Sequence, residues 1–295
     1  MRTHYRAVFL SPHLDDAVFS CGGLIAKLAQ AGEAILIVNI FSEYGNNTNR
    51  REEESQVAEF LRVDIKYLGE LDAIFRHKSY KSLLRIFSTI DSSDRRNFPN
   101  LADKLQNLLS TISYDTLYVP LGVGWHVDHL LTQEMGQLVA EKLKLCYYED
   151  APYVLLPNFT AYRLAQFGAK PMPNLAGAAR AASQALMSSA ATQKFSRSPF
   201  RFFIAWIVTA WFWVLLRRQR GRMISPREFE YELIDVEAEL ASKIQACQLY
   251  KSQFGEFYLD RSDCESRLRE YARQVGSGNT YFERYWWPGQ KPHGA

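Results

Sequence analysis

Short apolar runs alternate with helical segments along the first half of the chain. The runs are rich in β-branched and aromatic residues, as expected of buried strands, and cover residues 7–10, 34–41, 65–68, 116–119 and 145–148. Strands that alternate with helices are typical of a parallel sheet whose crossover helices cover both faces. The pattern therefore predicts an α/β fold: a Rossmann-like open sheet of mainly parallel strands.

The segments between these runs carry helical signals of different strength. Gly22-Gly23 is expected to open a helix that ends before Gly32, a residue suited to the position after a helix C-terminus. Further helices are predicted over residues 50–62, 101–112 and 130–143. Residues 72–100 show no clean periodicity apart from helical hints at 83–90, so we expect them to cover the sheet edge or the mouth of a site.

The second half of the chain changes to a mainly helical character. We place a boundary near Pro157, which gives an α/β domain over residues 1–156 and a C-terminal region over 157–295. Helices are predicted in the Ala- and Ser-rich segment 175–191 and in the periodic segment 228–254. Periodicity does not decide whether this region folds separately or wraps around the sheet.

Composition indicates which kinds of partner and which cell compartment to expect for this chain. Hydrophobic residues make up 47% of the 295 residues, which is ample for a packed core. The net charge of only +3 does not argue for a nucleic-acid partner. The four cysteines are scattered without CxxC spacing, and no secretory signal is visible, so we expect a cytoplasmic protein with reduced thiols.

Phe202–Leu216 is an uncharged apolar segment with three tryptophans, and four arginines follow it by residue 222. As a helix it would span about 22 Å, which is short of the ~30 Å hydrocarbon core of a bilayer. Two interpretations of segment 201–222 stay open. It is a peripheral helix at the inner face of the membrane, with arginines on anionic lipid, or it is a buried helix or a contact of a homo-oligomer.

Two polar motifs follow two of the predicted strands. Ser11-Pro12-His13-Leu14-Asp15-Asp16 comes directly after the run at 7–10, and His126-Val127-Asp128-His129 follows the strand that ends at Pro120. Open parallel sheets bind ligands at the carboxyl ends of their strands. The two motifs are therefore expected to converge although they lie far apart in the sequence.

The residue types in these motifs suit a metal-dependent hydrolase. A catalytic zinc site commonly has three protein ligands and keeps one position for water, and His13, Asp16 and His129 would supply such a set. Asp15 is the natural general base. His126 would stabilise an oxyanion or protonate a leaving amine, and Asp128 would orient an imidazole. For either motif alone the plainer interpretation is helix capping and an ordinary hydrogen-bonded histidine.

Together the two motifs resemble those of the LmbE-like, or PIG-L, family of zinc-dependent N-acetylglucosaminyl deacetylases. That family's motifs are usually His-Pro-Asp-Asp and His-Pro-Asp-His; here Leu14 and Val127 replace the prolines, and neither supplies a ligand atom. The resemblance covers residues 5–155 well and residues 157–222 hardly at all. It implies a Rossmann-like sheet, zinc on the three ligands named above, Asp15 as base and His126 as the oxyanion or acid group.

Weaker similarities add three candidate substrate contacts. Arg50 lies in a segment similar to a family helix start, and Glu149 and Asp150 belong to a Tyr-Glu-Asp-Ala-Pro-Tyr segment common in members that act on glycans. Structural explanations compete with each, namely helix-start charges for Arg50 and a strand-to-turn exit for the other two.

The expected function is deacetylation of an N-acetylglucosamine-type conjugate, either a small molecule or a lipid-linked precursor in glycan biosynthesis. Zn²⁺ is the expected cofactor, with another divalent metal such as Fe²⁺ as the alternative. Two other functions stay open: an amidase for another sugar or thiol conjugate, and a non-catalytic sugar-binding or membrane-associated protein. Nucleotide binding is disfavoured because no GxGxxG follows the first strand.

Overall fold

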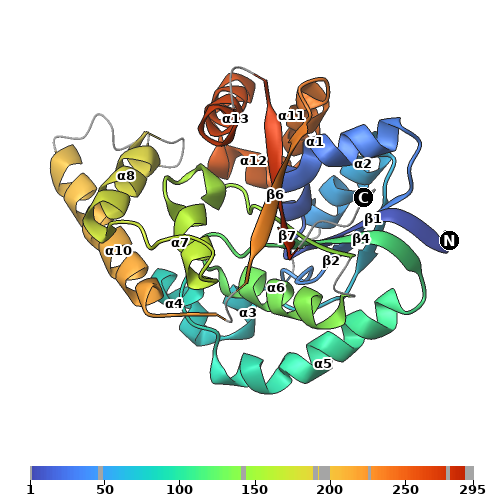
Figure 1. Ribbon diagram of the computed structural model, residues 1–295, viewed down its shortest axis with the longest axis horizontal. Coiled ribbons are helices and arrows are strands. Elements are labelled where there is room, and N and C mark those ends of the chain that lie inside the picture. Colours follow the sequence, from blue (N-terminus) through green and yellow to red (C-terminus); the bar gives the residue numbers. More distant parts are fainter. Residues whose placement is uncertain are drawn as a thin grey trace.

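A single seven-stranded sheet forms the centre of the computed structural model, which describes residues 2–45, 49–140, 144–188, 192, 200–224, 227–276 and 280–289 (Figure 1). The strand order is β3-β2-β1-β4-β5-β7-β6. The strands are β1 (His4–Ser11), β2 (Ile35–Asn39), β3 (Asp64–Tyr67), β4 (Ser113–Pro120), β5 (Leu145–Tyr148), β6 (Phe229–Asp235) and β7 (Phe282–Pro288). β1 to β5 are parallel, whereas β7 is antiparallel to both β5 and β6. The predicted mainly parallel α/β fold is confirmed.

Helices cover both faces of this sheet. One buried cluster joins the sheet to α1 (Asp16–Gln30), α2 (Asn49–Leu61), α11 (Leu240–Leu249) and α13 (Arg261–Val275). The other joins it to α5 (Ser92–Leu109), α6 (Val127–Val139), α7 (Phe159–Gln166), α8 (Leu175–Met187) and α10 (Arg201–Arg220). The shorter elements are α3 (Ala73–Arg76), η1 (Lys78–Lys81), α4 (Leu83–Ile86), η3 (Tyr153–Leu155) and α12 (Lys251–Phe257).

The first helix begins at Asp16, which corrects the expected start at Gly22-Gly23. Both glycines lie inside α1, where the helix packs closely on the C-terminal half of the chain. A Cβ on Gly22 would lie 2.9 Å from Cγ of Lys243, and one on Gly23 would lie 2.7 Å from Cγ2 of Val236. The glycines therefore permit a close approach rather than start a helix. α5 likewise starts earlier than expected, at Ser92 instead of residue 101.

The C-terminal half wraps around the sheet, because β7 pairs with β5 and β6 pairs with β7. Both hydrophobic clusters contain residues from either side of residue 157. The expectation of a helix over 228–254 is wrong at residues 229–235, which form β6. Its sequence Phe-Glu-Tyr-Glu-Leu alternates apolar and acidic residues with a period of two, a strand signal that the helical interpretation overlooked.

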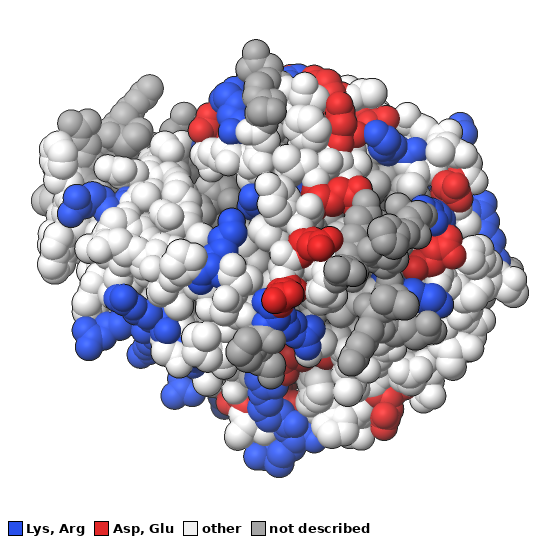
Figure 2. All heavy atoms as spheres, viewed as in Figure 1, with Lys and Arg blue, Asp and Glu red and all other residues white. Residues whose placement is uncertain are grey.

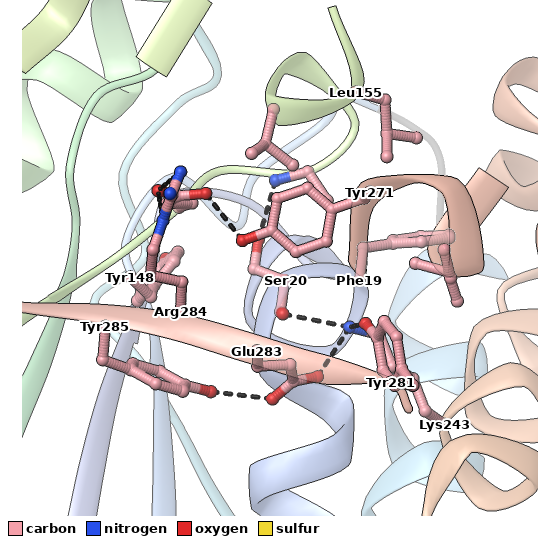
Figure 3. Close-up of a pocket in the computed structure, with 14 residues that line it drawn as sticks. Phe19, Ser20, Tyr148, Leu155, Lys243, Tyr271, Tyr281, Glu283, Arg284 and Tyr285 are labelled. Carbon is pink, nitrogen blue, oxygen red and sulfur yellow. Dashed lines mark hydrogen bonds and ion pairs between the residues drawn. The ribbon is translucent and has the colours of Figure 1, made fainter. Parts of the chain in front are cut away.

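A buried ion pair fastens α11 and β7 to α1 (Figure 3). The Lys243 ammonium donates hydrogen bonds to the Ser20 carbonyl at 3.0 Å, the Tyr281 hydroxyl at 2.9 Å and the Glu283 carboxylate at 2.7 Å. Glu283 also accepts from two backbone N–H groups of α1 at 2.9 Å. Burial alone would lower the pKa of Lys243, but the Glu283 charge raises it well above its usual value. This contact joins the helix that begins at Asp16 to the C-terminal half.

α10 has one buried and one exposed face. Phe212, Leu215 and Leu216 are buried in the core, whereas Phe203 is 60% and Trp206 67% exposed. α8 lies beside α10, with the Ser183 hydroxyl donating to the Ala205 carbonyl (Figure 1). Within the described residues, no helix combines the length and the apolar character that crossing a membrane requires.

Candidate metal centre and active site

The two motifs meet at the point where the strand order reverses. β1 and β4 are parallel neighbours in the sheet, and their following loops leave from the same edge. Such a switch point is the usual ligand site of open α/β sheets. The His13 ring centroid lies 5.0 Å from that of His126 and 5.4 Å from that of His129.

The three predicted ligands converge on one another. Oδ2 of Asp16 lies 3.0 Å from Nδ1 of His13 and 3.2 Å from Nε2 of His129. Metal–ligand bonds of about 2.1 Å would place neighbouring ligand atoms about 3.0–3.4 Å apart, so these separations fit a shared divalent cation. Among the described residues, the groups whose ligand atoms all lie within 4.8 Å of one another are His13-His126-His129 and His13-Asp72-Asp128. The first contains both predicted histidine ligands, and Asp16 contacts each of them.

His13 and His129, the two predicted histidine ligands, each have a second carboxylate on the other ring nitrogen. Nε2 of His13 lies 3.0 Å from Asp128, and Nδ1 of His129 lies 2.7 Å from Asp150. Burial opposes protonation, but the carboxylates raise the pKa of His13 well above its usual value and that of His129 to about 9. Carboxylate–histidine pairs of this kind orient metal ligands in proteins. The role of Asp128 in orienting an imidazole stays a prediction, and its contact with His13 is the one that such a role requires.

A further layer of contacts fixes those two carboxylates. Asp128 accepts from the Ala73 N–H at 2.9 Å and from the Arg76 guanidinium at 2.6 Å, and Arg76 also binds both carboxylate oxygens of Asp94. Asp150 accepts two backbone N–H groups of the β4–α6 loop at 2.9 Å. Sequence reasoning missed Arg76 and Asp94, which lie in the segment without clean periodicity.

Asp15 is held apart from its neighbour Asp16. Its backbone has a φ of +131°, which a non-glycine residue adopts only under strain, and its carbonyl accepts from the first N–H groups of α1. The side chain is buried, with Oδ2 3.7 Å from the Arg50 guanidinium. Burial, together with the charge of Asp16, raises the pKa of Asp15 well above its usual value. Adjacent carboxylates thus face different partners.

His126 is positioned as a neutral hydrogen-bond donor. It precedes α6, and its Nδ1 accepts from the Asp128 N–H at 3.3 Å, which leaves the proton of a neutral ring on Nε2. Burial and the positive charge of His13 lower the pKa of His126 well below its usual value. The ring also packs edge-to-face against Phe87, with centroids 5.5 Å apart.

The three candidate substrate contacts have different surroundings. Arg50 faces Asp15 and stacks on Tyr44 at 4.1 Å, so it stays a candidate. Glu149 is 5% exposed and accepts hydrogen bonds from Tyr271, Arg284 and Trp286.

These partners link Glu149 to α13 and β7, and a substrate contact through Glu149 stays a prediction. The surroundings of Asp150 oppose the same prediction for that residue. Asp150 is 0% exposed, and both its oxygens are used by His129 and the loop N–H groups. It supports a histidine rather than a substrate.

Replacing Asp150 with asparagine is expected to weaken metal binding by about 10–100-fold, because the neutral amide no longer supports His129 as a ligand. Competition with a coloured chelator measures this affinity. Asp103→Asn, an exposed carboxylate on α5, is the matched control and should leave the affinity unchanged. Equal metal affinities in the two variants would show that Asp150 does not support His129 as a metal ligand.

Part of the chain matches a known protein family and curated relatives. Residues 8–140 match the PIG-L family, described as GlcNAc-PI de-N-acetylase. A 2'-N-acetylparomamine deacetylase of Streptomyces fradiae is 27% identical over 165 residues, which cover 50% of this chain and 57% of that protein. The chain thus matches little more than half the length of this relative.

Solved structures resemble the whole fold. A deacetylase–bog complex from the biosynthesis pathway of teicoplanin superposes with a TM-score of 0.62 at 21% identity, covering 96% of this chain and 97% of that one. The zinc inhibited form of teicoplanin deacetylase Orf2 gives 0.59 at 20% identity, covering 95% and 97%. The family match over residues 8–140, the two motifs and the shared fold point the same way: this part of the chain is similar to the PIG-L, or LmbE-like, family.

Proposed function

We propose that this protein is a metal-dependent hydrolase that removes the acetyl group from the 2-acetamido nitrogen of an N-acetylglucosamine-type conjugate. The observation that carries the proposal is the position of the Asp16 carboxylate between His13 and His129, each backed by a further carboxylate. The name of the Streptomyces relative, which specifies removal of an N-acetyl group from an amino sugar, supports the reaction type.

His13, Asp16 and His129 would hold the metal. Two imidazoles and one carboxylate suit Zn²⁺, and Fe²⁺ accepts the same donors. When bound, a divalent metal would lower the pKa of a water molecule and polarise the acetamide carbonyl.

The remaining residues supply proton transfer and orientation. Asp15 accepts the proton of the attacking water, and its separation from Asp16 keeps this base free of the ligand set. His126 donates its Nε2 proton as a hydrogen bond to the acetamide oxygen, where negative charge develops. As the C–N bond breaks, Asp15 returns its proton to the nitrogen, so that acetate and a free amine leave. The Arg50 guanidinium forms an ion pair with the Asp15 carboxylate and so helps to position it.

The proposal is tested by measuring primary-amine release from N-acetylated monosaccharide glycosides by the metal-loaded protein. His126→Ala should lower kcat by about 10²–10³-fold, the usual effect of losing one oxyanion donor. A wild-type protein that releases no amine from any N-acetylated sugar would contradict the proposal. Amine release only from other acylated sugars or thiol conjugates would favour the amidase alternative. Sugar binding without amine release would favour the non-catalytic sugar-binding alternative.

We further propose that the exposed face of α10 makes a peripheral contact with anionic membranes such as the inner face of the cytoplasmic membrane. Phe203, Trp206 and Trp213 recur at helical spacing on this face, and the exposed Arg217 and Arg218 follow. Basic side chains gather near the C-terminal end of α10 in Figure 2. Aromatic and basic residues in this order are typical of interfacial helices.

Trp206→Glu is expected to reduce co-sedimentation with vesicles of phosphatidylglycerol by roughly fivefold or more, because a charge replaces an inserted ring. Leu138→Glu, an equally exposed position on α6, is the control. If the wild-type protein stays in the supernatant, the proposed membrane contact is wrong. Light scattering would then show whether this face of α10 joins two copies of the chain.

A further inference from the structure

An apolar cavity of about 270 Å³ lies beside the metal centre. Its walls come from η3, α7, α8, α10, α12 and α13, together with the residue that follows α4 and the β4–α6 loop. Its lining includes Phe87, Tyr153, Phe159, Leu186, Trp211 and Leu215. The volume is near the lower end of the ~300–1,000 Å³ range of small-molecule pockets.

Two aromatic rings form a wall that the cavity shares with the catalytic histidines. The Phe87 ring centroid lies 5.5 Å from that of His126, and the Tyr153 centroid lies 5.5 Å from that of His129. The two rings contact each other at 5.7 Å. Gly124, in the loop that delivers His126, also lines the cavity, and a Cβ there would lie 2.4 Å from Cγ of Tyr153. Only the thickness of the Phe87 or Tyr153 ring therefore separates the metal centre from the cavity, so a group attached to a sugar at the metal centre would reach the cavity.

The lining suits an apolar occupant. Its charged members are Glu256, which is exposed, and Arg267, which is hydrogen-bonded to Asp263 and to the Ser188 carbonyl. A polar group that entered would lose hydrogen bonds to water and find few new partners, whereas an alkyl chain loses none. Burial of alkyl surface is itself favourable.

We propose that this cavity binds an alkyl chain in the aglycone of the substrate while the acetamido sugar lies at the metal centre. The inference rests on the proposed deacetylase function and narrows its substrate class to amphiphilic amino-sugar conjugates. The buried face of α10 thus contributes to a substrate site through Trp211 and Leu215, and its opposite face is exposed.

The test compares methyl and octyl N-acetyl-β-glucosaminide, with the octyl compound below its micelle concentration. For the wild type we expect kcat/KM to be at least about tenfold higher for the octyl glycoside, mainly through a lower KM. Ala185 lines the cavity from α8, so Ala185→Phe should fill it and bring the two values together, mainly by raising KM for the octyl glycoside. Gln184→Phe, exposed on the same helix, is the matched control and should keep the preference.

Equal kcat/KM values for the two glycosides in the wild type, or a preference that survives in a folded Ala185→Phe, would overturn the inference. Failure to release amine from either glycoside is a failure of the proposed function instead. Calorimetric titration with octyl and methyl β-glucoside, which lack the acetamide, then tests the cavity alone. Tighter binding of the octyl compound that is lost in Ala185→Phe supports the cavity as an alkyl site, and equal binding overturns it.

Discussion

Asp15→Asn is expected to lower kcat for amine release by about 10²–10⁴-fold while metal stays bound at the wild-type level. The amide matches the carboxylate in shape but cannot accept the proton of the attacking water. The metal is retained because Asp16, not Asp15, contacts both ligand histidines. Turnover of an N-acetylated sugar and metal content after dialysis measure the two properties separately.

Asp16→Ala provides the contrasting variant, because it removes the oxygen shared by His13 and His129. Metal content should fall together with activity. If Asp15→Asn kept more than about a tenth of wild-type turnover, the assignment of the general base would be wrong. If it lost metal as readily as Asp16→Ala, the division of roles between the neighbouring aspartates would be wrong.

Lys243→Met is expected to lower the free energy of unfolding by about 3–5 kcal/mol, because it leaves the buried Glu283 carboxylate without its cation. Lys243 is 1% and Glu283 3% exposed, so solvent does not compensate for the loss. The effect should be large although the pair lies outside the candidate site. Urea unfolding followed by circular dichroism measures it.

The double variant Lys243→Met/Glu283→Gln should be less destabilised than Lys243→Met alone, since no unpaired charge remains. Arg273→Met, which breaks the exposed pair with Glu270, is the control and should change stability by about 1 kcal/mol or less. Strictly additive losses in the double variant would show that the buried pair does not fasten the C-terminal half to α1.

The strands and the convergence of the two motifs could be predicted because they depend on local patterns. An apolar run followed by a polar motif marks the carboxyl end of a buried strand, and the parallel order of β1 and β4 then brings His13 and His129 together. The sheet topology brings these residues together, and the resemblance to the family motifs suggests a chemical role for each. Leu14 and Val127, which replace the prolines of those motifs, are both buried.

Contacts between distant segments could not be predicted in the same way. Arg76 reaches Asp128 from the short helix α3, and Asp94 in the first turn of α5 binds Arg76; both lie in the segment that lacks clean periodicity. Glu149 and Asp150 are adjacent at the end of β5, yet one side chain meets β7 and the other meets His129. The partners of Glu149 lie on α13 and β7, more than 100 residues further along the chain, and no local pattern in the sequence indicates those contacts.

Metal analysis of the purified protein tests the proposed centre most directly. After loading with Zn²⁺ or Fe²⁺ and dialysis, the wild type should hold about one divalent ion per chain, as expected for one site with three protein ligands. Asp16→Ala should hold far less, and a chelator should abolish amine release until metal is restored. A folded wild-type chain that retains no stoichiometric divalent metal under these conditions would contradict the assignment of His13, Asp16 and His129 as a metal site.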